Sequence, residues 1–119
     1  MRFSERQVGG VIVIDAEGDL IVTDNPCAVK EFVKTILNRG DRRIVLNVAR
    51  IHRVDSTCLG EIIGSYTTTA VLGGVLKLAQ PDRHLRHLLE LTRLNTIIEV
   101  FDSEAAAVAS FGVAESRVT

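Results

Sequence analysis

The sequence predicts an α/β fold, in which a mixed, mostly parallel sheet of four to five strands packs with about four helices. Two observations lead to this class. Runs of β-branched residues alternate with segments whose apolar residues recur at helical spacing. The chain has 119 residues, of which 46% are hydrophobic, so it can bury one modest core. Since no Pro/Gly-rich linker divides it, we expect residues 1–119 to form a single domain.

Five segments of the sequence are expected to be strands. The first two, VIVIDAEG and LIV, would flank a turn at Gly18-Asp19. They would pair antiparallel, because that turn is too short for a crossover. RRIVLNV, which ends at Val48, is a nearly continuous β-branched run and is typical of a central strand buried on both faces. VLKLAQ and TIIEVF would supply the remaining strands.

Four helices are expected between and after these strands. The first would be capped by Asn25, with Pro26 at the first helical position, and would end at Gly40. The second would start near Asp55-Ser56 and stop at Gly73-Gly74. The third would open at Pro81, and the last would be capped by Ser103 and end at Gly112. Alternation of strands and helices of this kind places most strands parallel to one another.

Composition excludes several classes of function. A formal net charge of -1 provides no field that would select nucleic acid or acidic membranes. No apolar run approaches the roughly 20 residues needed to span a bilayer, and the N-terminus lacks a signal-peptide pattern. The two cysteines fit no metal or redox spacing. We therefore expect a reduced, cytoplasmic protein with no direct nucleic-acid partner, no membrane insertion, no metal and no cofactor.

The stretch VDSTCLGEIIG, from Val54 to Gly64, carries the most informative pattern. If each helical residue advances about 100° and Thr57 is placed at zero, the apolar residues of this helix gather on the opposite side. These expected core residues are Leu59, Ile62, Ile63, Tyr66 and Ala70. Thr57 is therefore expected to point outward. Ser56 would lie beside the buried stripe, where it is available as an N-cap.

Gly60 and Gly64 are expected on the same side of the helix as Thr57, together with Glu61 and Thr68. A glycine inside a helix costs about 1 kcal/mol relative to alanine, so two of them on an exposed face bring no benefit to folding. They would allow another surface to approach the helix backbone closely. The pattern thus indicates a hydroxyl beside a smooth patch and an acid.

Three interpretations of the adjacent hydroxyls remain open at this point. In the first, Asp55 or Ser56 is no more than a helix cap. A catalytic nucleophile is a weaker interpretation, because there is no G-x-S-x-G elbow, no convincing base, no P-loop and no dinucleotide fingerprint. The third interpretation is a phosphorylation switch at Thr57.

VDSTCLG resembles the D-S-S/T-G-L-G signature of STAS-domain anti-sigma factor antagonists, and the resemblance covers most of the chain. GDL, from Gly18, is similar to the family's G-E/D-L turn. RRIVLNVARIHRVDST is similar to its central strand and the loop into the signature helix. The segment from GGVLKLAQ to VASF is similar to its remaining strand–helix–strand–helix pattern. The resemblance implies a single STAS-like domain over residues 1–119.

The resemblance also implies a function. In that family the second hydroxyl of the signature is phosphorylated, which points to Thr57, with Ser56 as the second choice. It implies a bacterial, non-enzymatic module that binds an anti-sigma factor acting also as a serine/threonine kinase. A metal-dependent serine/threonine phosphatase would reverse the modification, and a homodimer is left open. The partner-binding residues implied are Asp55, Ser56, Thr57, Cys58, Gly60, Glu61, Gly64, Asp19 and Ile21.

Two positions depart from the family pattern. Cys58 stands where the family usually has glycine, and Ile21 stands where it often has a polar residue. Two alternative functions are kept beside the main one. The first is a STAS scaffold of a stressosome or of a lipid-transporter complex. The second is a small hydrolase or nucleotide-binding enzyme that uses Ser56 or Thr57.

Overall fold

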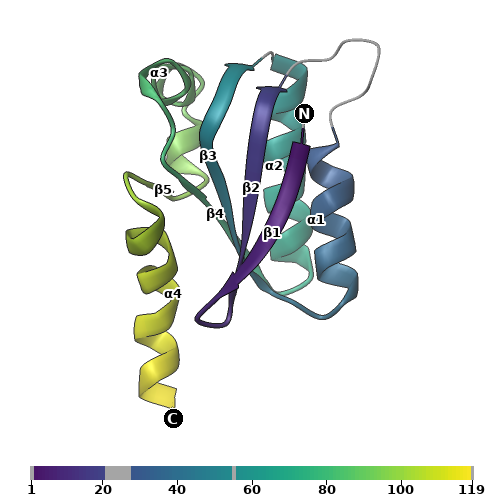
Figure 1. The fold of residues 1–119 in the computed structure, drawn as a ribbon, viewed down its shortest axis with the longest axis vertical. Coiled ribbons are helices and arrows are strands. Elements are labelled where there is room, and N and C mark those ends of the chain that lie inside the picture. Colours follow the sequence, from purple (N-terminus) through teal and green to yellow (C-terminus); the bar gives the residue numbers. More distant parts are fainter. Residues whose placement is uncertain (1, 21–27, 55, 119) are drawn as a thin grey trace.

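The computed structural model describes residues 2–20, 28–54 and 56–118 (Figure 1). Within these residues five strands form one sheet, namely β1 (Arg2–Val8), β2 (Val11–Leu20), β3 (Arg43–Val54), β4 (Val75–Ala79) and β5 (Val100–Phe101). The helices of the same residues are α1 (Val29–Asn38), α2 (Ser56–Val71), α3 (Arg83–Leu91) and α4 (Glu104–Val118), with a short 3-10 helix at Leu94–Thr96.

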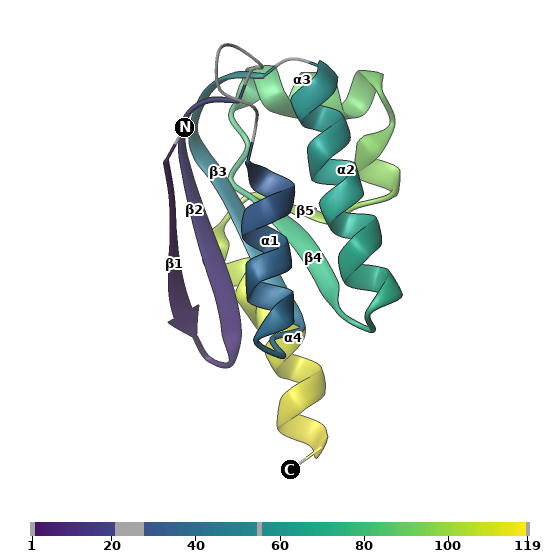
Figure 2. The same ribbon diagram turned by 90° about the vertical axis from the view of Figure 1, so that its right-hand side faces the viewer.

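The strands follow one another across the sheet in the order β1-β2-β3-β4-β5. β1 pairs antiparallel with β2, and every later pair is parallel. Each parallel pair needs a crossover, which α1, α2 and α3 provide in turn. Figure 2 shows α1 and α2 in front of the sheet, with α4 on its far side. The predicted mixed, mostly parallel α/β fold is therefore confirmed for the described residues.

The predicted turn at Gly18-Asp19 is wrong. β2 runs through both residues, and the hairpin turn lies earlier, at Gly9 and Gly10. Both of these glycines have positive φ, as the two-residue turns that suit strand twist require. Between Gly18 and Asp19 the pairing with β3 shifts register instead, and the strand continues without a turn. The antiparallel pair is thus β1 with β2, and β1 is a strand that the sequence pattern did not predict.

The first helix starts later than predicted. α1 begins at Val29 with Ala28 in the N-cap position, while Asn25 and Pro26 lie outside the described residues. Its first turn receives a cap from another helix, because the Lys30 backbone N–H donates to Oε1 of Glu61 at 3.3 Å. A capping group from α2 removes the need for a local capping residue at this start.

The C-terminal third differs from prediction in two details. Only Val100–Phe101 of the predicted strand TIIEVF pairs with β4, and part of the remainder forms the 3-10 helix. α4 continues through Gly112 to Val118, since one glycine in a helix interior costs only about 1 kcal/mol. The cap predicted at Ser103 is confirmed, because its Oγ accepts from the Ala106 N–H at 3.1 Å.

The core lies on both faces of the sheet and is unequal in size. The larger part fills the space between the sheet and α1, α2 and α3, and includes Ile14, Ile36, Ile44, Leu46, Ile62, Leu76, Leu85 and Ile98. The smaller part lies under α4 and consists of Val11, Val13, Val45, Ala79, Ala107 and Phe111. β3 contributes to both parts, so its prediction as a central strand is confirmed. α4 covers only part of its face, and the remainder of that face is lined by polar side chains.

Candidate functional site

The start of α2 presents the hydroxyl that the sequence singled out. Thr57 is exposed, as helical geometry predicted. Ser56 is exposed as well, and it is the first helical residue of α2. The expectation that Ser56 lies beside the buried stripe is therefore wrong. Both hydroxyls are accessible, and they lie in the first turn of a 16-residue helix.

The buried face of α2 is rotated from the predicted one. It consists of Cys58, Leu59, Ile62, Ser65 and Thr69, while Ile63 and Tyr66 are half-buried and Ala70 is exposed. Ser65 and Thr69 can be buried because each hydroxyl donates to a carbonyl one turn earlier in the helix, at 2.8 and 2.7 Å. Hydroxyl residues spaced four apart were the signal that could have revealed this face.

The two glycines of α2 have different surroundings. A Cβ added to Gly60 would meet nothing within 4 Å, so this residue leaves the helix backbone open. A Cβ on Gly64 would lie 3.6 Å from Nζ of Lys30, because the Lys30 side chain of α1 passes over it. Glu61, between the two, holds the first turn of α1. The helix backbone near Thr57 is thus open at Gly60, whereas the Lys30 side chain covers Gly64.

The other predicted partner residues divide into three groups. Cys58 is fully buried in the larger core, so its side chain leaves access to Thr57 open and cannot itself line a partner surface. Asp19 lies in β2, where it pairs with Arg53 near the end of β3 that leads into α2. Asp55 and Ile21 lie outside the described residues.

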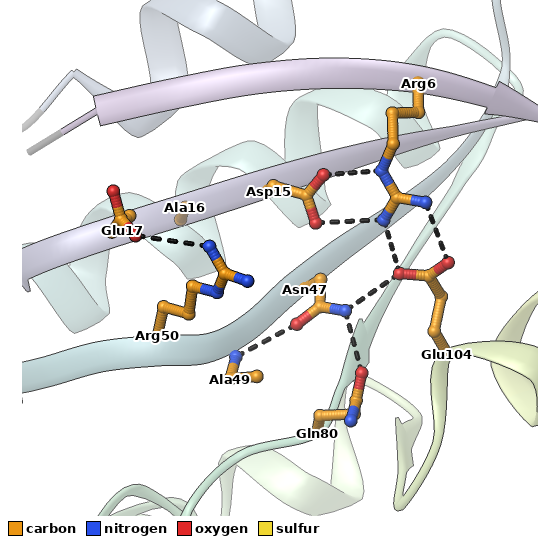
Figure 3. A pocket seen from close by; sticks show the side chains of 9 residues that line it. All are labelled: Arg6, Asp15, Ala16, Glu17, Asn47, Ala49, Arg50, Gln80 and Glu104. Atoms are coloured by element: carbon orange, nitrogen blue, oxygen red, sulfur yellow. Dashed lines mark hydrogen bonds and ion pairs between the residues drawn. The ribbon is translucent and has the colours of Figure 1, made fainter.

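A polar pocket that the sequence did not predict lies on the opposite face of the sheet (Figure 3). Its volume is about 460 Å³, and its lining is Arg6, Asp15, Ala16, Glu17, Asn47, Ala49, Arg50, Gln80 and Glu104. Arg6 donates from Nε and Nη2 to the two oxygens of Asp15, at 2.6 and 2.9 Å. The same guanidinium donates to both oxygens of Glu104, at 3.1 and 2.6 Å. One cation therefore joins β1, β2 and the start of α4.

Asn47 occupies the floor of this pocket. Its amide nitrogen donates to Oε1 of Gln80 and to Oε1 of Glu104, both at 2.9 Å, and its oxygen accepts from the Ala49 N–H at 3.0 Å. The hydrogen bond from Arg6 lowers the pKa of Glu104, so this carboxylate stays ionised at neutral pH. An asparagine within the apolar run RRIVLNV was the sequence signal for a polar site here, since asparagine is depleted in strands.

Among residues 2–20, 28–54 and 56–118, no three His, Cys, Asp or Glu side chains come together so as to hold a metal ion. Within the same residues, no helix has both the length and the apolar character needed to cross a membrane.

The order of strands and helices defines a mixed α/β domain. Residues 2–107 match the sequence profile of the STAS domain family, and the chain belongs to that family.

Relatives cover nearly the whole chain. A Thermotoga neapolitana protein described as a proposed anti-sigma factor antagonist is 24% identical over 106 residues, which are 89% of this chain and 94% of that protein. The anti-sigma F factor antagonist of Paenibacillus polymyxa is 25% identical over 104 residues, or 87% and 89% of the two chains. The phosphorylated form of the Bacillus cell fate determinant SpoIIAA shares the fold, with a TM-score of 0.67 at 18% identity over 92% of this chain and 99% of that one.

Proposed function

We propose that this chain is an anti-sigma factor antagonist, a non-enzymatic module that binds an anti-sigma factor and is released from it by phosphorylation of Thr57. The observation that carries the proposal is the exposed Thr57 hydroxyl in the first turn of α2. The names of the relatives and the phosphorylated state of SpoIIAA support it. The anti-sigma factor would also be the serine/threonine kinase, and a metal-dependent phosphatase would restore binding.

The switch would act through charge and bulk at the docking surface. A phosphate on Thr57 adds about -1.5 to -2 charge. At the N-terminus of α2 this charge is compatible with the helix dipole, and the Thr57 side chain is exposed, so the phosphate would project into solvent. The fold should therefore persist. A partner that rests on Gly60, where the backbone is open, would meet the phosphate directly.

The surface proposed for the partner follows from exposure. Ser56, Thr57 and Gly60 would contact the partner directly. Lys30 of α1 and Glu61 of α2 would lie beside them. Asp19 of β2 remains a predicted contributor, as do Ile21 and Asp55, which lie outside the described residues. Gly64 would act indirectly, by letting the Lys30 stem lie close to α2.

The test combines modification with binding. The chain is incubated with ATP and the serine/threonine kinases of its own genome, and the modified residue is mapped by mass spectrometry. We expect phosphate on Thr57, and we expect Ser56→Ala to be modified at the same residue. Titration calorimetry with the kinase that modifies it should show tight binding of Thr57→Ala and a loss of about a hundredfold or more for the phosphorylated chain.

Two results would contradict this proposal. Phosphorylated chain that binds as tightly as unmodified chain would show that Thr57 is no switch, as expected of a scaffold in a stressosome or lipid-transporter complex. A catalytic turnover that Thr57→Ala abolishes would favour the enzyme interpretation.

A further inference from the structure

The polar pocket has two charged walls, and the charged groups to which these walls belong differ in net charge. On one side Arg6 is shared between Asp15 and Glu104, so one cation meets two carboxylates and the group carries a net charge of -1. On the other side Arg50 contacts Glu17 within the lining, and Arg2, which lies outside the lining, contacts Glu17 as well, so that this group of three carries a net charge of +1. A cavity of about 460 Å³ lies beside these groups, within the range of small-molecule sites.

The charges on both walls persist at neutral pH. The hydrogen bond from Arg2 lowers the pKa of Glu17, and the hydrogen bond from Arg6 lowers the pKa of Glu104. Neither carboxylate therefore takes up a proton near pH 7, and arginine stays protonated throughout this range. The separation of charge is thus a fixed property of the folded chain.

Each wall keeps hydrogen-bonding capacity for a ligand. Arg50 contacts Glu17 at 3.3 Å, and its side chain is 76% exposed, so most of its five N–H groups face solvent. Asp15 is 35% exposed, and each of its oxygens accepts one bond from Arg6 although it can accept two. Figure 3 shows the Arg50 guanidinium directed toward Glu17 and the Asp15 carboxylate directed toward Arg6.

The floor between the walls is fixed in place. The side-chain amide of Asn47 donates hydrogen bonds to both Gln80 and Glu104. Gln80 has a φ of 60°, a left-handed conformation that is uncommon for a residue other than glycine, and its backbone N–H donates to the Phe101 carbonyl at 2.8 Å. Such backbone strain is often kept at binding sites, where it holds a group ready for a ligand.

We propose that this pocket binds a small zwitterion of the free α-amino acid class, with the ligand carboxylate at Arg50 and the ligand ammonium at Asp15. A guanidinium pairs with a carboxylate through two parallel hydrogen bonds, and a carboxylate with spare lone pairs accepts from an ammonium. A purely anionic or purely cationic ligand satisfies one wall and meets a like net charge at the other. The proposal does not involve Thr57 and goes beyond the proposed function.

The experiment titrates the isotope-labelled chain with L-serine, L-glutamate, L-lysine and L-leucine, followed by NMR. Each amino acid is compared with its N-acetyl derivative, which lacks the ammonium, and with its amide, which lacks the carboxylate. We expect at least one free amino acid to shift the backbone signals of Ala16, Ala49 and Gln80. Removal of either charge should weaken binding about tenfold or more.

Variants then test the assigned contacts. Arg50→Gln should weaken binding about tenfold or more, while its exposed position leaves thermal unfolding unchanged. Arg53→Gln, also exposed on β3 but outside the lining, is the matched control and should bind as the natural chain does. Asp15→Asn should weaken binding of the free amino acid and leave binding of its amide no stronger than before.

The proposal is wrong if none of the four amino acids shifts the pocket signals. It is equally wrong if the N-acetyl form binds as well as the free amino acid, which would indicate an anion site, or if the amide does, which would indicate a cation site. Because Thr57→Ala should bind the amino acid normally, failure here leaves the proposed function untouched, and the reverse also holds.

Discussion

Gly74 is the residue at which the chain leaving α2 passes closest to the segment that enters β3. A Cβ on Gly74 would lie 2.5 Å from the Arg42 carbonyl oxygen and 3.0 Å from Cγ2 of Thr69. Neither neighbour can move freely, because the Arg42 carbonyl accepts from the Val75 N–H at 2.9 Å and Thr69 is buried. Only glycine fits at this crossing.

We expect Gly74→Ala to lower the free energy of unfolding by about 1–3 kcal/mol, through overpacking against fixed backbone. Gly60→Ala is the matched control, since its new Cβ meets nothing within 4 Å. It should leave the free energy unchanged or raise it by up to about 1 kcal/mol, as alanine favours the helix. Urea denaturation of both variants makes the comparison, and equal stabilities would contradict it.

At the scale of residues, helical geometry predicted the outward position of Thr57 because the angle between residues of one helix is fixed. The same geometry misplaced Ser56 and Ala70, since the orientation of the whole helix depends on which side chains the sheet accepts. Ser65 and Thr69 are polar by residue type, yet their hydroxyls are satisfied within the helix and both are buried. Residue type alone does not reveal that local satisfaction.

Arg42 connects the ends of two helices. Its Nε donates to the Leu72 carbonyl just after α2, and its Nη1 donates to the Leu37 carbonyl in the last turn of α1, both at 2.9 Å. The last carbonyls of a helix have no partner within the helix, and a cation at that end also matches the dipole. One guanidinium therefore stabilises both helix ends and holds them beside each other.

Replacing Arg42 should destabilise the layer formed by α1 and α2. We expect Arg42→Ala to lower the free energy of unfolding by about 1–3 kcal/mol, because the hydrogen bonds from a charged donor to both helix ends are lost. Arg42→Lys should restore only part of this, as a single ammonium cannot reproduce the planar fork. Hydrogen exchange should rise in the last turns of α1 and α2. Arg83→Ala, exposed on α3, is the control and should change stability by less than about 0.5 kcal/mol.

At the scale of elements, the sequence predicted those with a buried apolar pattern and missed the one without it. β1 reads RFSERQV, is mostly exposed, and lies at the edge of the sheet, so alternation toward a core is weak. What orders β1 is the hairpin at Gly9-Gly10 and its pairing with β2, which propensity does not show. The start of α1 was misjudged for a similar reason, because Glu61 of α2 caps it.

At the scale of the molecule, the polar pocket shows why a site on this sheet could not be predicted. Its charged network joins Arg6 of β1 with Glu104 of α4, which are 98 positions apart in the chain. Hydrophobic periodicity places elements in layers, but it does not give the order of strands or the element that remains only partly covered. Asn47 was visible as an unusual strand residue, yet its partners were not.

α4 is held to the sheet by a small apolar contact and by two polar anchors. Ala107 and Phe111 supply its buried apolar side chains among the described residues. Lys77, only 7% exposed, donates to Oγ of Ser110 at 2.7 Å and lies 4.4 Å from the centre of the Phe111 ring. The second anchor is the ion pair of Arg6 with Glu104, the first residue of α4. With so little apolar area, the charged anchor at Glu104 should matter for the whole molecule.

Acid should therefore weaken the chain partly through Glu104. The hydrogen bond from Arg6 holds the pKa of Glu104 below its unfolded value of about 4.3. A lowered folded pKa means that Glu104 contributes stability above about pH 4.3, and that this contribution is lost as pH falls through the folded pKa. We expect the difference in unfolding free energy between the natural chain and Glu104→Gln to be constant from about pH 7 to 5 and to shrink below about 4.3.

Urea denaturation at each pH measures this difference. Glu90→Gln, exposed on α3, is the control, and its stability should follow that of the natural chain. A difference that stays constant down to about pH 3 would show that the Glu104 carboxylate does not anchor α4 through its charge.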